Sequence, residues 1–343
     1  MTYRFKLNET LAVGATRIGV DQIDIAQSRL ASRDQIATAV HNARRCLKRL
    51  RALLRLIRPA LPETIYRREA NRLSGIGKLL ASARDKHVMQ QTLAKIEAGF
   101  EGVPQSVSAK LAKLLANGAG PRGARTSAQE RRQALDGLEQ ARKFFAGTER
   151  RSISFDHLSA GVERSYRRAR RAFREAYADP SDEAFHEWRK AVQQHWRHMQ
   201  LISRAWPDVL GARAGEAKEL SRLLGDDHDI SVLLAFAQGR GKAVLDADEL
   251  AALEKVGKAI QADLRGLAKP RGARLFAEPA SDLRERMVLY WSAAHELFEQ
   301  TPTKADAEKP RGTKRGADRK AAAGASPEAQ AASRGSPPRR AGK

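Results

Sequence analysis

Hydrophobic residues recur at intervals of three and four along most of this chain, which is the spacing of one face of an α-helix. The clearest case is the stretch 38–58, where one apolar stripe comprises Val40, Ala43, Leu47, Leu50, Leu54 and Ile57. Basic residues share a neighbouring face of the same helix, at His41, Arg44, Lys48, Arg51 and Arg55. No acidic residue occurs between Gln35 and Pro62, so this helix lacks the i,i+4 pairs of opposite charge that stabilise a helix by ~0.2–0.5 kcal/mol each. The pattern indicates either a solvated basic surface or, as we expect, a row of cations that binds a polyanion.

Comparable patterns predict further helices along the chain. Their expected ranges are 18–30, 63–81, 86–97, 106–116, 128–146, 155–179, 182–205, 212–224, 228–238, 246–267 and 281–300. Ser181 is expected to cap one helix, and Gly225-Asp226-Asp227 is expected to end one helix and cap the next. Hydrophobic residues make up 42% of the chain, helix formers dominate, and runs of β-branched residues are almost absent. The sequence therefore predicts an all-α fold.

The same pattern divides the chain into parts. Four antiparallel helices with short connections predict a four-helix bundle at about 10–98, and a second bundle is expected at about 151–300. Glycine and proline mark a joint between them, at about 99–150. Residues 301–343 contain no Leu, Ile, Val, Phe, Trp or Tyr, and they hold 11 Lys or Arg against 4 Asp or Glu. We expect this stretch to be a disordered basic tail, because it cannot bury a core.

The two halves of the chain contain the same motifs at nearly one offset. VHNARR (40–45) matches FHEWRK (185–190) when the chain is shifted by 145 residues, and LLASARD (79–85) matches LLGDDHD (223–229) at a shift of 144. Because the two motifs recur in the same order, we infer a duplicated helical unit. Two bundles related by pseudo-two-fold symmetry would then place the repeated His-x-x-Arg elements on opposite sides of a shared channel.

The charge of the chain narrows the class of partner. Lys and Arg number 63 against 40 acidic residues, which gives a formal net charge of +23. Such an excess predicts a negatively charged partner, namely nucleic acid, anionic lipid or a phosphate polymer. The single cysteine, Cys46, excludes a disulfide within the chain and is expected to fill space near the apolar stripe. The sequence shows no stretch of 18 apolar residues, so we expect no membrane span.

Four stretches carry a resemblance to a known family. They are VHNARRCLKRLRALLRL (40–56), LLASARD (79–85), FHEWRKAVQQHWRHMQLI (185–202) and LSRLLGDDHDISVL (220–233). With them the chain resembles the CHAD (conserved-histidine α-helical domain) family over roughly residues 10–300. The resemblance implies two antiparallel four-helix bundles with pseudo-two-fold symmetry, binding of inorganic polyphosphate through a basic surface, and association with polyphosphate granules in bacterial cells. The residues that it implies for binding are His41, Arg44, Arg45, Lys48, Arg51, Arg55, Lys78, Arg84, His186, Arg189, Lys190, Arg197, Arg222 and His228.

Two departures from the repeat and the family pattern qualify this expectation. Gln193 and Gln194 stand where the first half has cations, so the two sides of the channel should bind unequally. No acidic, β-rich ExExK stretch of a triphosphate tunnel (CYTH) domain precedes the helices, so the hydrolase activity of such fusions is expected to be absent. Asp85 and Asp229, one in each copy, are expected to pair with arginines and orient them.

The sequence thus predicts a non-enzymatic polyphosphate-binding protein of the cytoplasm, associated with polyphosphate granules, without cofactor or metal. One alternative is a nucleic-acid-binding or nucleoid-associated protein, with the basic tail as main contact. Four tryptophans could stack on bases in that case, although Trp188 fits the apolar stripe of its helix: Trp188, Trp196, Trp206 and Trp291. A second alternative is a metal-dependent phosphohydrolase that uses the Asp226-Asp227-His228-Asp229 run. The oligomeric state and the preferred polyphosphate chain length stay open.

Overall fold

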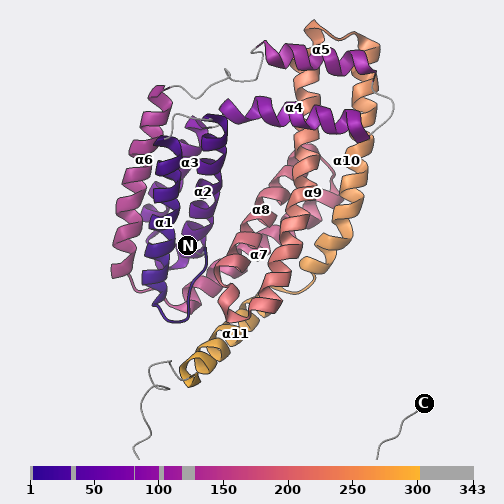
Figure 1. Ribbon diagram of the computed structural model, residues 1–343. Helices are drawn as coiled ribbons and strands as arrows, with labels where there is room; N and C mark the ends of the chain where they lie inside the picture. The colour runs from indigo at the N-terminus through magenta and orange to yellow at the C-terminus, as the bar shows by residue number, and fades with distance from the viewer. Residues whose placement is uncertain (1–2, 32–35, 81, 100–103, 118–127, 302–343) are drawn as a thin grey trace, which may run out of the picture. The chain divides into compact units, whose positions relative to one another are not determined.

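The computed structural model describes residues 3–31, 36–80, 82–99, 104–117 and 128–301. This part of the chain forms eleven α-helices and no strand (Figure 1), which confirms the all-α prediction. The helices are α1 (Leu11–Ala31), α2 (Ile36–Leu56), α3 (Glu63–Leu79), α4 (Ser82–Gly99), α5 (Gln105–Ala116), α6 (Ala128–Ala146), α7 (Phe155–Ala178), α8 (Asp182–Leu201), α9 (Pro207–Gly239), α10 (Ala247–Leu275) and α11 (Ala280–Gln300). Residues 1–300 form one compact unit, and the predicted tail lies outside the described residues from position 302 onward. Within the described part of the chain, no helix is long and apolar enough to cross a membrane.

The first group of helices consists of α1, α2, α3 and α6, which pack against one another around a shared core. Ile18 of α1, Leu50 of α2, Leu73 of α3 and Phe145 of α6 are all buried there. A Cβ at Gly19 of α1 would collide with the Phe145 ring, so α1 and α6 approach closely at this point. The fourth helix of this group is α6 and not the helix expected at 86–97, which corrects the bundle membership expected from the sequence.

Helix α4 instead belongs to a second, smaller core. Its apolar residues Met89, Leu93 and Ile96 are buried against α5 and against parts of α9 and α10. Ion pairs link the same elements, with Lys95 Nζ 2.9 Å from a carboxylate oxygen of Asp226 on α9. The sequence identified the apolar face of α4, but periodicity does not say which helix that face will meet.

The second group consists of α7, α8, α9 and α10, with α11 packed along α7. Ser181 caps α8 as expected, because its side chain accepts a hydrogen bond from Ala184 N. Trp188 of α8 is fully buried among Phe173, Tyr177 and Phe185. This aromatic cluster ties α7 to α8 and so fixes the orientation of the basic face of α8.

Helix α9 runs without a break from Pro207 to Gly239, so the predicted helix stop at Gly225-Asp226-Asp227 is wrong. The two aspartates bond to neighbouring helices instead of capping. Asp226 pairs with Lys95, and the buried Asp227 carboxylate accepts a 2.7 Å hydrogen bond from Arg265 Nε of α10. Helix α10 likewise continues past its predicted end at 267, through Pro270, because the buried Ala268, Gly272 and Leu275 hold its last turns against the core.

The helix bounds repeat with the offset found in the sequence. Shifting α2 by 145 residues gives 181–201, and α8 spans Asp182–Leu201. Shifting α1 by the same amount gives 156–176, and α7 spans Phe155–Ala178. The duplication therefore extends to these helices, and the pseudo-two-fold relation of the two groups stays a prediction.

Candidate functional site

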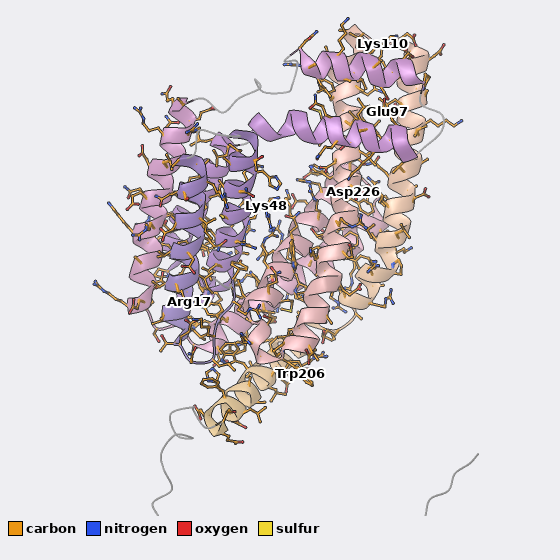
Figure 2. All side chains as sticks on the ribbon, viewed as in Figure 1. Arg17, Lys48, Glu97, Lys110, Trp206 and Asp226 are labelled. Atoms are coloured by element: carbon orange, nitrogen blue, oxygen red, sulfur yellow. The ribbon has the colours of Figure 1, made fainter. Side chains whose placement is uncertain are left out.

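A basic groove lies where α2 of the first group faces α8 of the second. It encloses about 470 Å³. Lys48 of α2 lies on the side of its helix that is turned toward α8 (Figure 2). Sixteen residues line the groove, from α2, α7, α8 and α9: Arg44, Lys48, Arg51, Ala52, Arg55, Arg168, His186, Glu187, Arg189, Lys190, Gln193, Gln194, Arg197, His228, Asp229 and Val232.

Helical periodicity places the α2 cations in this groove. Arg44, Lys48, Arg51 and Arg55 recur at intervals of three and four, so they share one face, and at about 1.5 Å per residue they extend over roughly 16 Å. The opposite face carries Leu50 among its residues and is buried in the core. The same amphipathic pattern therefore anchors the helix and presents its charges.

A buried histidine holds α2 and α8 together beneath the groove. His198 of α8 donates a 3.0 Å hydrogen bond from Nε2 to the Ala52 carbonyl of α2, and its Nδ1 lies 2.9 Å from Ser165 Oγ of α7. Complete burial lowers the pKa of His198 to about 3, because a charged ring cannot be solvated there. The ring is therefore neutral at physiological pH and acts as a structural link between three helices.

Arg44 and Arg189 occupy the same position of the repeated motif, but they make different contacts. Arg44 donates hydrogen bonds from Nη1 to the carbonyls of Gly77, at 2.9 Å, and Leu80, at 3.1 Å. These carbonyls belong to the end of α3, where a helix leaves its last acceptors without partners. Arg189 lies against Gly225 of α9, 3.6 Å from the position that a Cβ would take, but α9 continues through this point and has no helix end to cap.

Two histidines, one from α8 and one from α9, contact each other on the side of the groove that faces α2. The rings of His186 on α8 and His228 on α9 stack with centroids 4.0 Å apart. Burial, followed by the charges of Lys190 and Arg189, lowers the pKa of His186. At neutral pH the His186 ring is therefore uncharged, and the positive charge of this side comes from lysine and arginine.

The groove has a net positive charge, because its cations outnumber its carboxylates. Its lining contains eight Lys or Arg and two carboxylates, Glu187 and Asp229. Glu187 pairs with Arg168 at 2.9 Å and also with Lys190. Burial and the neighbouring Arg55 and Arg44 lower the pKa of Arg51, as expected where like charges approach one another.

Arg197 is the most buried cation of the groove. It is 9% exposed, and its Nη1 donates a 2.6 Å hydrogen bond to the Gln193 carbonyl. Burial lowers its pKa to about 10, which still leaves it charged at neutral pH. Its guanidinium carbon lies 4.7 Å from the centroid of the Trp196 ring, so Arg197 connects the groove to the neighbouring face of α8 that carries Trp196.

No cluster of three or more His, Cys, Asp or Glu that could hold a metal ion occurs among the described side chains. In the Asp226–Asp229 run, Asp226 and Asp227 pair with Lys95 and Arg265. These pairs use the oxygens that a metal would need, so the run fits structural ion pairs better than metal ligation.

The two repeated helices, α2 and α8, both contribute residues to one basic groove, and the sequence that forms them matches a known family. The family model for the CHAD domain matches residues 20–238. This chain belongs to the CHAD family. A comparison with curated proteins gave no match. The family match ends within α9, so α10 and α11, which complete the core of the second group, lie beyond the matched part of the CHAD domain.

The structure brings most of the binding residues predicted from the CHAD resemblance into one place. Nine of them line the groove, together with Asp229: Arg44, Lys48, Arg51, Arg55, His186, Arg189, Lys190, Arg197 and His228. Lys78 lines an adjoining pocket of about 260 Å³ that shares Arg44, Lys48 and Arg51 with the groove.

Other predicted residues lie elsewhere. His41 and Arg45 are exposed on α2 but do not line the groove, and the exposed Arg222 pairs with Glu219 and Asp226. Arg84 and Asp85 lie in a part of α4 whose side chains the structure does not describe.

Arg168 of α7 lines the basic groove and was not among the residues expected to bind polyphosphate. The sequence showed it within a basic helix face that also contains Arg164 and Arg171, but helical spacing alone does not reveal that one member of this face reaches α8. Its ion pair with Glu187 is the contact that places it there.

Proposed function

We propose that this CHAD protein binds inorganic polyphosphate in the groove between α2 and α8, without converting it chemically. The observation that carries the proposal is the lining of this one groove, with eight Lys or Arg against two carboxylates. A phosphate chain carries many negative charges and no apolar handle, so its affinity depends on the number of cations that it meets. Arginine suits such a ligand because its forked N–H donors reach two phosphate oxygens at once.

The rigidity of the scaffold supports the same conclusion. The α2 cations project from a helix whose other face is buried, and His198 ties that helix to α8. Pre-organised cations lose less side-chain entropy when the ligand binds. Residence in the cytoplasm and association with polyphosphate granules are part of this proposal, and a polyphosphate-rich granule would offer many overlapping binding segments to such a groove.

Salt dependence gives a quantitative test, because counterion release drives the association of a polyanion. By analogy with single-stranded nucleic acid, each neutralised phosphate contributes about −0.7 to the slope of log affinity against log salt. Six to eight contacts therefore predict a slope of roughly −4 to −6. Binding of labelled long-chain polyphosphate across a salt series measures this slope.

The decisive variant is Arg51→Gln/Arg55→Gln. Neither arginine makes a hydrogen bond or ion pair within the described residues, whereas Arg44 supports the end of α3 and is a poor probe. The variant should lose at least about tenfold in affinity, and its salt slope should become shallower by about 1.4. The matched control, Arg132→Gln/Lys143→Gln, removes two exposed cations from α6 and should bind within about twofold of the parent protein.

The alternatives give different results in the same assay. Single-stranded DNA of equal charge should compete weakly if the groove selects polyphosphate. If DNA competes equally and Arg51→Gln/Arg55→Gln binds normally, the nucleic-acid function is the better one. Release of phosphate that requires a divalent cation and disappears in Asp229→Ala would support the phosphohydrolase and contradict a purely binding role.

A further inference from the structure

A second cavity of about 470 Å³ is lined by other residues of α8, Trp196 and Gln200, and shares no lining residue with the basic groove. Its walls come from the N-terminal segment, α2, α8 and α9. The side chains that matter for its chemistry are Arg4, Arg49, Trp196 and Lys218, and Gly211 and Gly215 form part of its floor. The volume is within the range of ~300–1,000 Å³ that is typical of small-molecule sites.

The N-terminal wall is fixed by specific contacts. Phe5 is completely buried, and its backbone N–H donates a 2.9 Å hydrogen bond to the Leu201 carbonyl at the end of α8. Tyr3 Oη donates a 2.8 Å hydrogen bond to the Arg49 carbonyl of α2. Arg17 Nη2 donates at 2.8 Å to the Arg4 carbonyl. One wall of the cavity is therefore a segment that specific contacts hold in place.

The cavity is positively charged, because its lining includes three cations and no carboxylate. Arg49 Nη1 donates to the neutral Gln22 side chain at 3.1 Å. Neither Arg4 nor Lys218 has an ion-pair partner within the part of the chain that the structure describes. The acidic neighbours of Lys218 on α9 are engaged elsewhere, since Glu216 pairs with Arg271 and Glu219 with Arg222. An anionic ligand would supply the missing counter-charge.

The floor and one wall of the cavity suit a flat ring. Gly211 and Gly215 are one helical turn apart, and a Cβ at either would meet nothing within 4 Å. Glycine inside a helix is less favourable than alanine, and no close contact with another helix explains these two. They leave a flat strip of α9 backbone next to Trp196, whose ring is held by the guanidinium of Arg197 at 4.7 Å.

We propose that this cavity binds a nucleoside phosphate, with its base between Trp196 and the glycine floor of α9 and its phosphates held by Arg4, Arg49 and Lys218. Polyphosphate needs only the cations, whereas the aromatic wall and flat floor select a planar ring. The site is separate from the groove of the proposed function, so either assignment can fail without the other.

ATP is the probe for this proposal, and calorimetric titration of the full chain at physiological salt is the measurement. ATP affinity should fall at least tenfold in Arg4→Gln/Lys218→Gln, which removes two cations, and in Gly215→Leu, which fills the floor. Trp196→Phe should weaken ATP and should remove the quenching of tryptophan fluorescence that ATP causes. The groove variant Arg51→Gln/Arg55→Gln should retain ATP affinity within twofold.

Folding of each variant is checked by its melting temperature, and Gly215→Leu should melt no lower than the parent because leucine favours the helix. Tripolyphosphate carries the phosphates without the base, and the groove of the proposed function would bind it as well. The two ligands are therefore compared in the groove variant Arg51→Gln/Arg55→Gln, to which tripolyphosphate should bind at least tenfold more weakly than ATP. Equal affinities for the two compounds would overturn the nucleoside assignment. Loss of ATP binding in the groove variant, with normal binding in Arg4→Gln/Lys218→Gln, would overturn the site itself.

Discussion

Replacing Arg51 and Arg55 by glutamine should make the protein more stable while it binds polyphosphate less well. The two side chains lie one turn apart on α2, and Lys48 lies three residues before Arg51. The variant removes two like-charge contacts, each worth about 0.2–0.5 kcal/mol, and glutamine has nearly the same helix propensity as arginine. The free energy of unfolding should therefore rise by about 0.4–1.0 kcal/mol. This corresponds to an increase of roughly 1–4 °C in the melting temperature.

The assay is thermal unfolding followed by circular dichroism, first in about 20 mM salt and then in about 0.5 M salt. The gain should shrink at high salt because the Debye length falls from ~10 Å at 0.1 M to ~3 Å at 1 M. The control variant Arg132→Gln/Lys143→Gln should gain nothing, because α6 mixes both signs of charge, with Asp136 and Glu139 each four residues from a replaced cation. A lower melting temperature for Arg51→Gln/Arg55→Gln would show that the groove cations are compensated within the fold and would refute the reasoning.

Three further results are expected. Gly161→Ala should lower the free energy of unfolding by ~1–3 kcal/mol, because a Cβ there would collide with the backbone at the end of α2. Gly266→Ala, in open space on α10, should raise the free energy of unfolding by ~0.5–1 kcal/mol. Chemical denaturation measures both values, and equal effects would contradict the packing at Gly161. Burial lowers the pKa of His195 and His198 below the unfolded value near 6.5, so both rings take up protons when the protein unfolds. The free energy of unfolding should therefore fall as the pH drops below ~6.5, with a slope of about 2.7 kcal/mol per pH unit near pH 5. A free energy of unfolding that stays constant between about pH 6.5 and 5 would exclude neutral buried rings. Deleting 301–343 should leave the melting temperature within about 1 °C but weaken polyphosphate binding at low salt, since these residues carry seven net positive charges; abolished binding would instead identify this stretch as the main contact.

Helix α2 shows how much could be read from the sequence. Its apolar stripe and its basic face follow directly from residues at intervals of three and four, because the geometry of a helix is local and the same everywhere. The duplication was visible for a similar reason, since two copies of one motif at a constant offset need no tertiary information. Together these features gave the all-α fold, most of the α2 and α8 groove residues, and the family.

The failures of prediction lie where a contact between distant segments decided the outcome. Gly225-Asp226-Asp227 reads as a helix stop, but Asp227 finds Arg265 on α10 and the helix continues. Arg222 was predicted to be a groove cation, but it is exposed on α9 and forms ion pairs with Glu219 and Asp226.

Most of the helices, their apolar faces and the density of positive charge could be read from local sequence, because each depends on residues within a few turns of one another. Contacts between distant segments are what make α6 and not α4 the fourth helix of the first group, bring Arg168 to the groove, and make the N-terminal segment one wall of a second cavity beside Trp196. An apolar stripe shows that one face of a helix must be buried, but it does not show which other helix buries that face. The choice among possible partners is made by the fit of side chains such as Phe145 against Gly19, which appears only when the whole chain is packed.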